Sequence, residues 1–129
     1  MNDPDETDAS RRLLLEEIST LEDIQGKLAA NEKREDDGFR MELATLRRQA
    51  WEHINSIKRI SRTYFDMVDE PEIKKDFCEL LVHMDQVQFE HQRKWRGLDV
   101  DHNDARYRSS VQQVMRTNRE LTDWARKKI

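Results

Sequence analysis

Residues 43–67 read LATLRRQAWEHINSIKRISRTYFDM, and one set of side chains in this run recurs at alternating spacings of three and four. The positions with this spacing are Leu43, Leu46, Ala50, His53, Ile57, Ile60, Tyr64 and Met67. An α-helix places such positions on one face, whereas a half-buried strand needs strict alternation. The run therefore predicts one long amphipathic helix with a single stripe for packing.

Three further segments repeat this pattern. Their stripes are Leu14, Ile18, Leu21, Ile24 and Leu28, then Ile73, Phe77, Leu80, Met84, Val87 and His91, and last Tyr107, Val111, Val114, Asn118, Leu121 and Ala125. Breaks at 31–38, 69–72 and 97–103 separate the four segments, and the whole chain has only 3 Gly and 2 Pro. So few residues that break helices favour a few long helices over sheets and turns.

The predicted fold is an all-α, antiparallel up-down bundle of four helices. In such a bundle short connections bring Leu21 opposite Ala50, and Phe77 opposite both Tyr64 and Leu121, so three consecutive hairpins close in register. The first helix is expected to end opposite Ile60. That leaves an end with three helices only, so a three-helix bundle with a loosely packed N-terminal helix is the alternative.

Charge alternates along the chain in step with the predicted helices. Residues 1–42 carry 6 Lys and Arg against 13 Asp and Glu, and residues 65–91 carry 2 against 8. Residues 43–64 carry 5 against 1, and residues 92–129 carry 10 against 5. In an up-down bundle each helix then faces oppositely charged neighbours, with like charges across the diagonal.

Bulk properties bound the class of protein. A chain of 129 residues fits one domain with a continuous core, which we assign to residues 10–129, after an acidic leader at residues 1–9 that we expect to be disordered. Helix capping is expected near Asp8 or Ser10. The single cysteine, Cys78, cannot form an internal disulfide, and the acidic N-terminus is unlike a signal peptide. With no apolar run long enough for a membrane span, we expect a cytoplasmic protein without membrane contact.

The third predicted helix has a second apolar line. Cys78, Val82 and Phe89 follow helical spacing on the face away from the stripe, and a helix that is apolar on two sides needs two partners. We therefore predict a partner-binding surface there, although scattered surface apolar residues are common.

A similar flank lies on the second predicted helix, where Trp51, Ile54 and Phe65 fall beside the stripe. Trp51 and Phe65 join the predicted partner-binding set. Trp95 and Trp124 lie at the margins of their stripes. Core packing is favoured for the tryptophans over a role as interface anchors.

His53 and His91 are the candidate ligand or metal residues, because each occupies a stripe position, with Tyr107 predicted beside His91. Inward-facing histidines of bundles do bind haem or metals. The carboxylates of a di-iron site are missing, however, and hydrogen-bonded seam residues are the favoured interpretation. No cofactor is expected.

Basic clusters raise the question of nucleic acid. They are Arg47-Arg48, Lys58-Arg59-Arg62, Arg93-Lys94-Arg96, Arg106 with Arg108, and Arg126-Lys127-Lys128. Phosphate binding requires a continuous positive surface, whereas the predicted fold puts acidic helices between the basic ones, and the net charge is -4. Solvated faces paired with acidic neighbours are the favoured explanation.

No catalytic motif appears: the chain lacks a glycine-rich phosphate loop, paired cysteines, a serine elbow and HExxH. A small helical enzyme with scattered Arg and Glu leaves no such signature, so that class stays open. The sequence favours a non-catalytic helical interaction protein, an adaptor, chaperone-like or regulatory subunit. It is expected to bind a protein partner or a second copy through the outer face of the third helix and the three-helix end. A ligand-binding or metal-binding bundle is the alternative, and nucleic-acid binding ranks third.

Overall fold

A computed structural model describes residues 4–34, 36–96 and 100–129, and these residues form four α-helices and no strand. The helices are α1 (Pro4–Asn31), α2 (Phe39–Met67), α3 (Pro71–Lys94) and α4 (Ala105–Lys128). They confirm the predicted all-α bundle, and each break falls where the apolar spacing stops.

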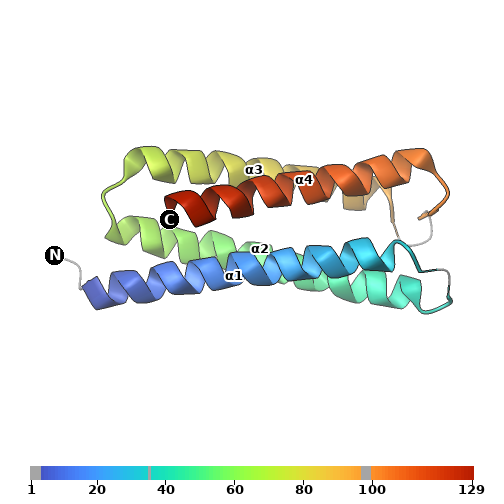
Figure 1. The fold of residues 1–129 in the computed structure, drawn as a ribbon, viewed down its shortest axis with the longest axis horizontal. Coiled ribbons are helices and arrows are strands. Elements are labelled where there is room, and N and C mark those ends of the chain that lie inside the picture. Colours follow the sequence, from blue (N-terminus) through green and yellow to red (C-terminus); the bar gives the residue numbers. More distant parts are fainter. Residues whose placement is uncertain (1–3, 35, 97–99) are drawn as a thin grey trace.

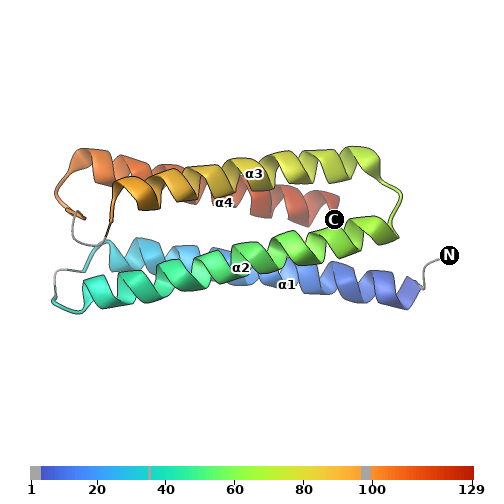
Figure 2. The same cartoon turned by 180° about the vertical axis from the view of Figure 1, so that it is seen from behind.

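The helices form two antiparallel hairpins, α1 with α2 and α3 with α4, stacked as two layers (Figure 1). Each helix packs on its sequence neighbours, and α1 also packs on α4. The diagonal pairs make no comparable backbone approach in the described residues. Seen from behind, α2 and α3 lie on the near side of the bundle (Figure 2). The charge alternation thus places every acidic helix between two basic ones.

The chain becomes helical earlier than its sequence predicts. Helix α1 begins at Pro4, so residues 4–9 are helical and not a disordered leader, and the expected start near Asp8 or Ser10 is wrong. Residues 1–3 lie outside the described residues. Proline suits a first helical position because its missing N–H has no helical acceptor there, and Asp5 and Glu6 interact favourably with the positive end of the helix dipole.

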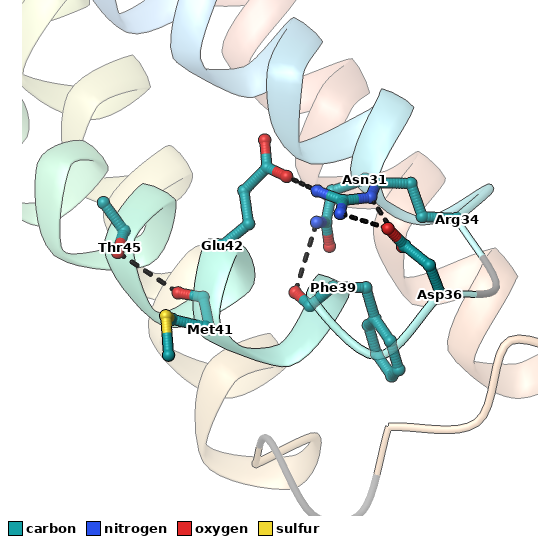
Figure 3. Close-up of polar contacts among 7 residues, drawn as sticks. All are labelled: Asn31, Arg34, Asp36, Phe39, Met41, Glu42 and Thr45. Carbon is teal, nitrogen blue, oxygen red and sulfur yellow. Dashed lines mark hydrogen bonds and ion pairs between the residues drawn. The ribbon is translucent and has the colours of Figure 1, made fainter.

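Polar contacts close the connection between α1 and α2 (Figure 3). The side-chain amide of Asn31 donates to the carbonyl of Phe39 at 3.2 Å. The guanidinium of Arg34 pairs with Asp36, and also with Glu42 in the first turn of α2.

At the later breaks, Pro71 begins α3, and the carboxylate of Asp104 accepts from the backbone N–H of Arg106 at the start of α4. Pro71 thus occupies a first helical position and Asp104 an N-cap position, which are places that proline and aspartate favour.

The core runs the length of the bundle in two clusters. The larger contains Leu14, Ile18, Leu21, Ile24, Leu46, Ala50, Ile54, Ile57, Ile60, Tyr64, Phe65, Phe77, Leu81, Met84, Leu121 and Ala125. The smaller contains Leu43, Trp95, Val100, Tyr107 and Val111 and closes the end near the α1–α2 connection. All stripe positions predicted for the fourth helix are buried. On α2 and α3 the buried face is rotated from the predicted stripe. Ile54, Phe65, Leu81 and Gln88 are buried, whereas the predicted positions His53, Met67, Ile73, Leu80, Val87 and His91 are only partly buried.

The expected three-helix end does not exist, because α1 extends over it. The guanidinium of Arg11 lies 5.9 Å from the centre of the Tyr64 ring, and Leu14 shares the larger cluster with Phe77 and Leu121. Leu14 and Leu21 have no exposed surface, so α1 is an integral core helix. The three-helix alternative is therefore wrong.

Candidate functional site

The α2–α3 pair has the loosest backbone packing of the four neighbouring pairs, although a larger cavity, of about 680 Å³, lies between α3 and α4 and is lined mostly by polar residues. The backbones of α2 and α3 rarely approach each other closely, whereas the other three neighbouring pairs pack tightly. Two cavities of about 440 and about 290 Å³ lie between α2 and α3. Together they form the α2–α3 groove, and Figure 2 views the bundle from this side. We call the cavity nearer the α2–α3 connection the lower half of the groove, and the cavity farther from that connection the upper half.

The lower half has an apolar floor and a basic rim. It is lined by Lys58, Ser61, Arg62, Phe65, Lys74, Cys78, Leu81 and Val82. Phe65 and Leu81 are buried and form the floor, while Cys78 and Val82 are exposed along the α3 wall. Every charged residue of this lining is a cation.

The upper half carries the largest exposed aromatic side chains of the described residues. It is lined by Trp51, Ile54, Lys58, Asp85, Gln86, Gln88, Phe89, Glu90 and Gln92. Trp51 on α2 and Phe89 on α3 are each 63% exposed, and Ile54 and Gln88 are buried beneath them. Two aromatic side chains therefore flank a mostly polar depression.

An ion pair crosses the groove where its halves meet. The Nζ atom of Lys58 lies 2.6 Å from a carboxylate oxygen of Asp85, and Lys58 lines both halves. Both side chains are more than a third exposed, so solvent screens the pair and its contribution is about 1 kcal/mol or less. Such a bridge can open at low cost when another molecule enters.

The structure brings all five predicted partner-binding residues to this groove. Cys78, Val82 and Phe89 form the α3 wall, and Trp51 and Phe65 stand on α2. The sequence alone did not predict that the apolar line of α3 and the apolar flank of α2 border the same groove. Phe65 differs from the expectation of a surface flank, because it is only 5% exposed and its ring packs 5.4 Å from that of Phe77.

The tryptophans divide between core and surface. Trp95 is buried, and Trp124 is partly buried with its ring 6.0 Å from that of Phe77, as core packing predicts. Trp51 is the exception, because it projects from the α2 side of the groove. Its exposure leaves its apolar surface free for a partner.

The two candidate histidines contact different helices: His53 on α2 contacts α1, and His91 on α3 contacts α4. The Nδ1 atom of His53 lies 2.6 Å from a carboxylate oxygen of Glu17 on α1. The Nδ1 atom of His91 lies 2.7 Å from the hydroxyl of Ser110 on α4, and its ring stacks on Tyr107 at 5.8 Å. The predicted contact between His91 and Tyr107 is therefore present, whereas His53 points to α1 and does not join them. Within residues 4–34, 36–96 and 100–129, no group of three His, Cys, Asp or Glu side chains could hold a metal ion.

The His91–Ser110 pair is poorly suited to nucleophilic catalysis. Burial, and to a smaller extent the charge of Arg47, lowers the pKa of His91 to about 4. A serine hydroxyl needs a base whose pKa lies near the working pH, and a histidine with so low a pKa takes that proton weakly. The arrangement thus fits a neutral, hydrogen-bonded seam residue.

Arg47 is a functional residue of the fold that sequence reasoning missed. The basic pair Arg47-Arg48 predicts a solvated face, but the guanidinium of Arg47 is partly buried and donates from Nη1 to the carbonyl of Trp95 at 2.7 Å. That carbonyl belongs to the residue that ends α3, where the negative end of the helix dipole attracts a cation. Burial lowers the pKa of Arg47. Helical spacing does distinguish it from Arg48, because Arg47 lies four residues after Leu43 and three before Ala50, on the buried side of α2.

Comparison of the chain with protein-family models, with curated proteins and with solved structures finds no match. In the described part of the chain, none of the helices combines the length and apolar character that crossing a bilayer requires.

Proposed function

We propose that this protein is a non-catalytic helical interaction protein, an adaptor or regulatory subunit, that binds its partner in the α2–α3 groove. The observation that carries the proposal is the gathering of exposed apolar side chains. Among the described residues the large exposed apolar side chains are Leu13, Met41, Trp51, Val82 and Phe89, and the last three line this one groove. Isolated exposed apolar residues are ordinary, whereas a contiguous set beside a cavity marks an interaction surface.

The energetics support binding of moderate strength. Full burial of a valine or phenylalanine side chain contributes about 1.5–3 kcal/mol, and Val82 and Phe89 are now 53% and 63% exposed. Tryptophan is enriched among the residues that dominate interface energies, and Trp51 offers a large rigid surface. The bundle end is not part of the proposal, because α1 covers it.

The exposed thiol of Cys78 supports a reducing compartment such as the cytoplasm as the place of action. A free, accessible thiol beside an interface is oxidised or cross-linked in an oxidising compartment. Cytoplasmic localisation accordingly belongs to the same proposal.

The sole cysteine also provides the test. Benzophenone-maleimide attached to Cys78 would place a photo-cross-linker inside the groove. We expect defined adducts, either a dimer or a heterologous protein, in which the label joins Cys78 to one reproducible peptide. The matched control is Cys78→Ser/Gln112→Cys, which moves the label to an exposed position on α4.

The variant Val82→Lys/Phe89→Lys tests the same surface by replacing two of its exposed apolar side chains with charged ones. We expect it to abolish association in sedimentation velocity and to remove the Cys78 adducts. Helicity and melting temperature should change little, since exposed positions far from core contacts alter stability by about 0.5 kcal/mol or less. Adducts that survive this variant, or equal labelling from position 112, would count against the groove.

A further inference from the structure

The two halves of the α2–α3 groove differ in charge. The charged residues of the lower half are Lys58, Arg62 and Lys74, and the upper half adds Asp85 and Glu90. In the described chain no ion pair engages the side chains of Arg62 and Lys74, although the protein as a whole carries a net charge of -4. An apolar floor rimmed by unpaired cations is complementary to an apolar ligand with negative charge.

The dimensions indicate a helical ligand. Trp51 and Phe65 stand 14 residues apart on α2, which is about 21 Å at a rise of 1.5 Å per residue. A segment lying there has helices on both sides and no strand edge to pair with, so the backbone groups that face the groove floor find partners only within the segment itself. An α-helix of about four turns does this and packs its apolar ridge between two helices.

A second copy of the chain offers no free acidic amphipathic helix for this groove. Its acidic helices, α1 and α3, bury their apolar stripes in the core of their own bundle. A helix of a separate protein is therefore the occupant that matches both the apolar floor and the cations of the rim.

We propose that the α2–α3 groove binds an acidic amphipathic helix of another protein. Its apolar ridge lies on Phe65 and Leu81 and against Val82, and its carboxylates lie over Arg62 and Lys74. Aromatic contacts with Trp51 and Phe89 hold the opposite end. This inference rests on the proposed function and adds the chemistry of the partner to it.

Two synthetic peptides test the charge preference. The first is an 18-residue helix of Leu, Ala and Glu with one apolar face, and the second has every Glu replaced by Lys. Fluorescence anisotropy of the labelled peptides should show that the acidic peptide binds at least about tenfold more tightly than the basic one at low salt. Raising the NaCl concentration should weaken this binding.

Charge reversal within the groove supplies the decisive comparison. The variant Arg62→Glu/Lys74→Glu should lose at least about tenfold in affinity for the acidic peptide and gain affinity for the basic one. The matched control Arg119→Glu/Lys127→Glu reverses two exposed charges on α4 and should shift both affinities about twofold or less. Circular dichroism checks that each variant keeps its helicity.

The outcomes separate this inference from the proposed function. If Val82→Lys abolishes binding but charge reversal changes nothing, the groove is a docking site and the acidic chemistry of its partner is wrong. If neither peptide binds while the protein forms a dimer that Val82→Lys dissolves, the occupant is a second copy and the inference is overturned. If both peptides fail and Cys78 forms no specific adduct, both proposals fall.

Discussion

Gln25 and Gln88 show how a single polar contact sits inside the apolar core. The amide nitrogen of Gln25 on α1 donates to the amide oxygen of Gln88 on α3 at 2.7 Å, and both side chains are buried. This bond crosses the diagonal of the bundle. The amide oxygen of Gln25 is buried without a hydrogen-bond partner in the described residues, so the bond to Gln88 offsets only part of the cost of burying the two amides, and removal of one partner adds to that cost.

A double-mutant cycle tests the energetics of this pair. Gln88→Leu leaves the Gln25 amide without its partner and should lower the free energy of unfolding by about 1–3 kcal/mol. Gln25→Leu/Gln88→Leu should recover most of that loss, because leucine has a similar volume and no polar group. Urea unfolding monitored by circular dichroism measures all four proteins. A double variant as unstable as the two single variants combined would contradict the pairwise account.

His91 makes stability depend on pH. Its pKa of about 4 lies below the ordinary 6.5 because of burial among α2 and α4 groups, with Arg47, Tyr107 and Ser110 facing the ring. The unfolded chain therefore binds the proton more tightly than the folded chain. Stability from this group is complete above about pH 6.5 and falls as the pH drops toward 4, by at most about 3 kcal/mol.

The variant His91→Gln isolates this contribution. It removes the titrating group and retains a side chain able to hydrogen-bond Ser110. The difference in unfolding free energy between pH 7.5 and pH 4.5 should be smaller in the variant than in the original protein. Parallel pH profiles for the two proteins would show that another group is responsible.

Among the four helices, α1 differs most from its sequence-based prediction, because it starts earlier and packs along the whole bundle. The predicted stripe is right, and the contact of His53 with Glu17 lies within one residue of the predicted register that sets Leu21 opposite Ala50. The prediction failed at the N-terminus, where residues 4–9 have a composition typical of disorder. Their helix is supported by the turns that follow, because Leu14 and Leu21 pack in the core and propagation from a formed helix is easier than nucleation.

Core truncation tests whether α1 is integral. Leu21→Ala on α1 and Leu121→Ala on α4 remove side chains with no exposed surface, and each should cost about 2–5 kcal/mol. Leu13→Ala is the control, since Leu13 is 46% exposed, and it should change stability by about 0.5 kcal/mol or less. A negligible effect of Leu21→Ala would revive a loosely attached first helix.

The whole molecule is organised by the alternation of charge around the bundle. Arg126 on α4 pairs with Glu22 on α1, and Lys58 on α2 pairs with Asp85 on α3. These pairs are exposed, so each contributes about 0.2–1 kcal/mol and is sensitive to salt. The arrangement favours the up-down order over alternatives that place helices of the same sign side by side.

Salt therefore should lower stability slightly. Raising NaCl from 20 to 500 mM should reduce the free energy of unfolding by about 1 kcal/mol or less, as screening weakens the attraction between neighbouring helices. Glu22→Gln/Arg126→Gln should be less sensitive to salt. A marked rise in stability with salt would mean that repulsion within each helix outweighs attraction between helices.

Local patterns in the amino-acid sequence predict the number of helices, the positions of the connections and the buried stripe of α4. These follow from the period of the apolar side chains and from Pro71 and Asp104, which act over a few residues. The sequence also indicated that Cys78, Val82 and Phe89 lie off the core face. Their exact neighbours were beyond a local pattern.

The packing of all four helices, which no local pattern predicts, brings Trp51 and Phe65 on α2 to the same groove as the apolar line of α3. The reason is physical: periodicity fixes which side of a helix is apolar, whereas the separation of two helices depends on how side chains of all four fill the core together. A groove is the space that this packing leaves open between α2 and α3.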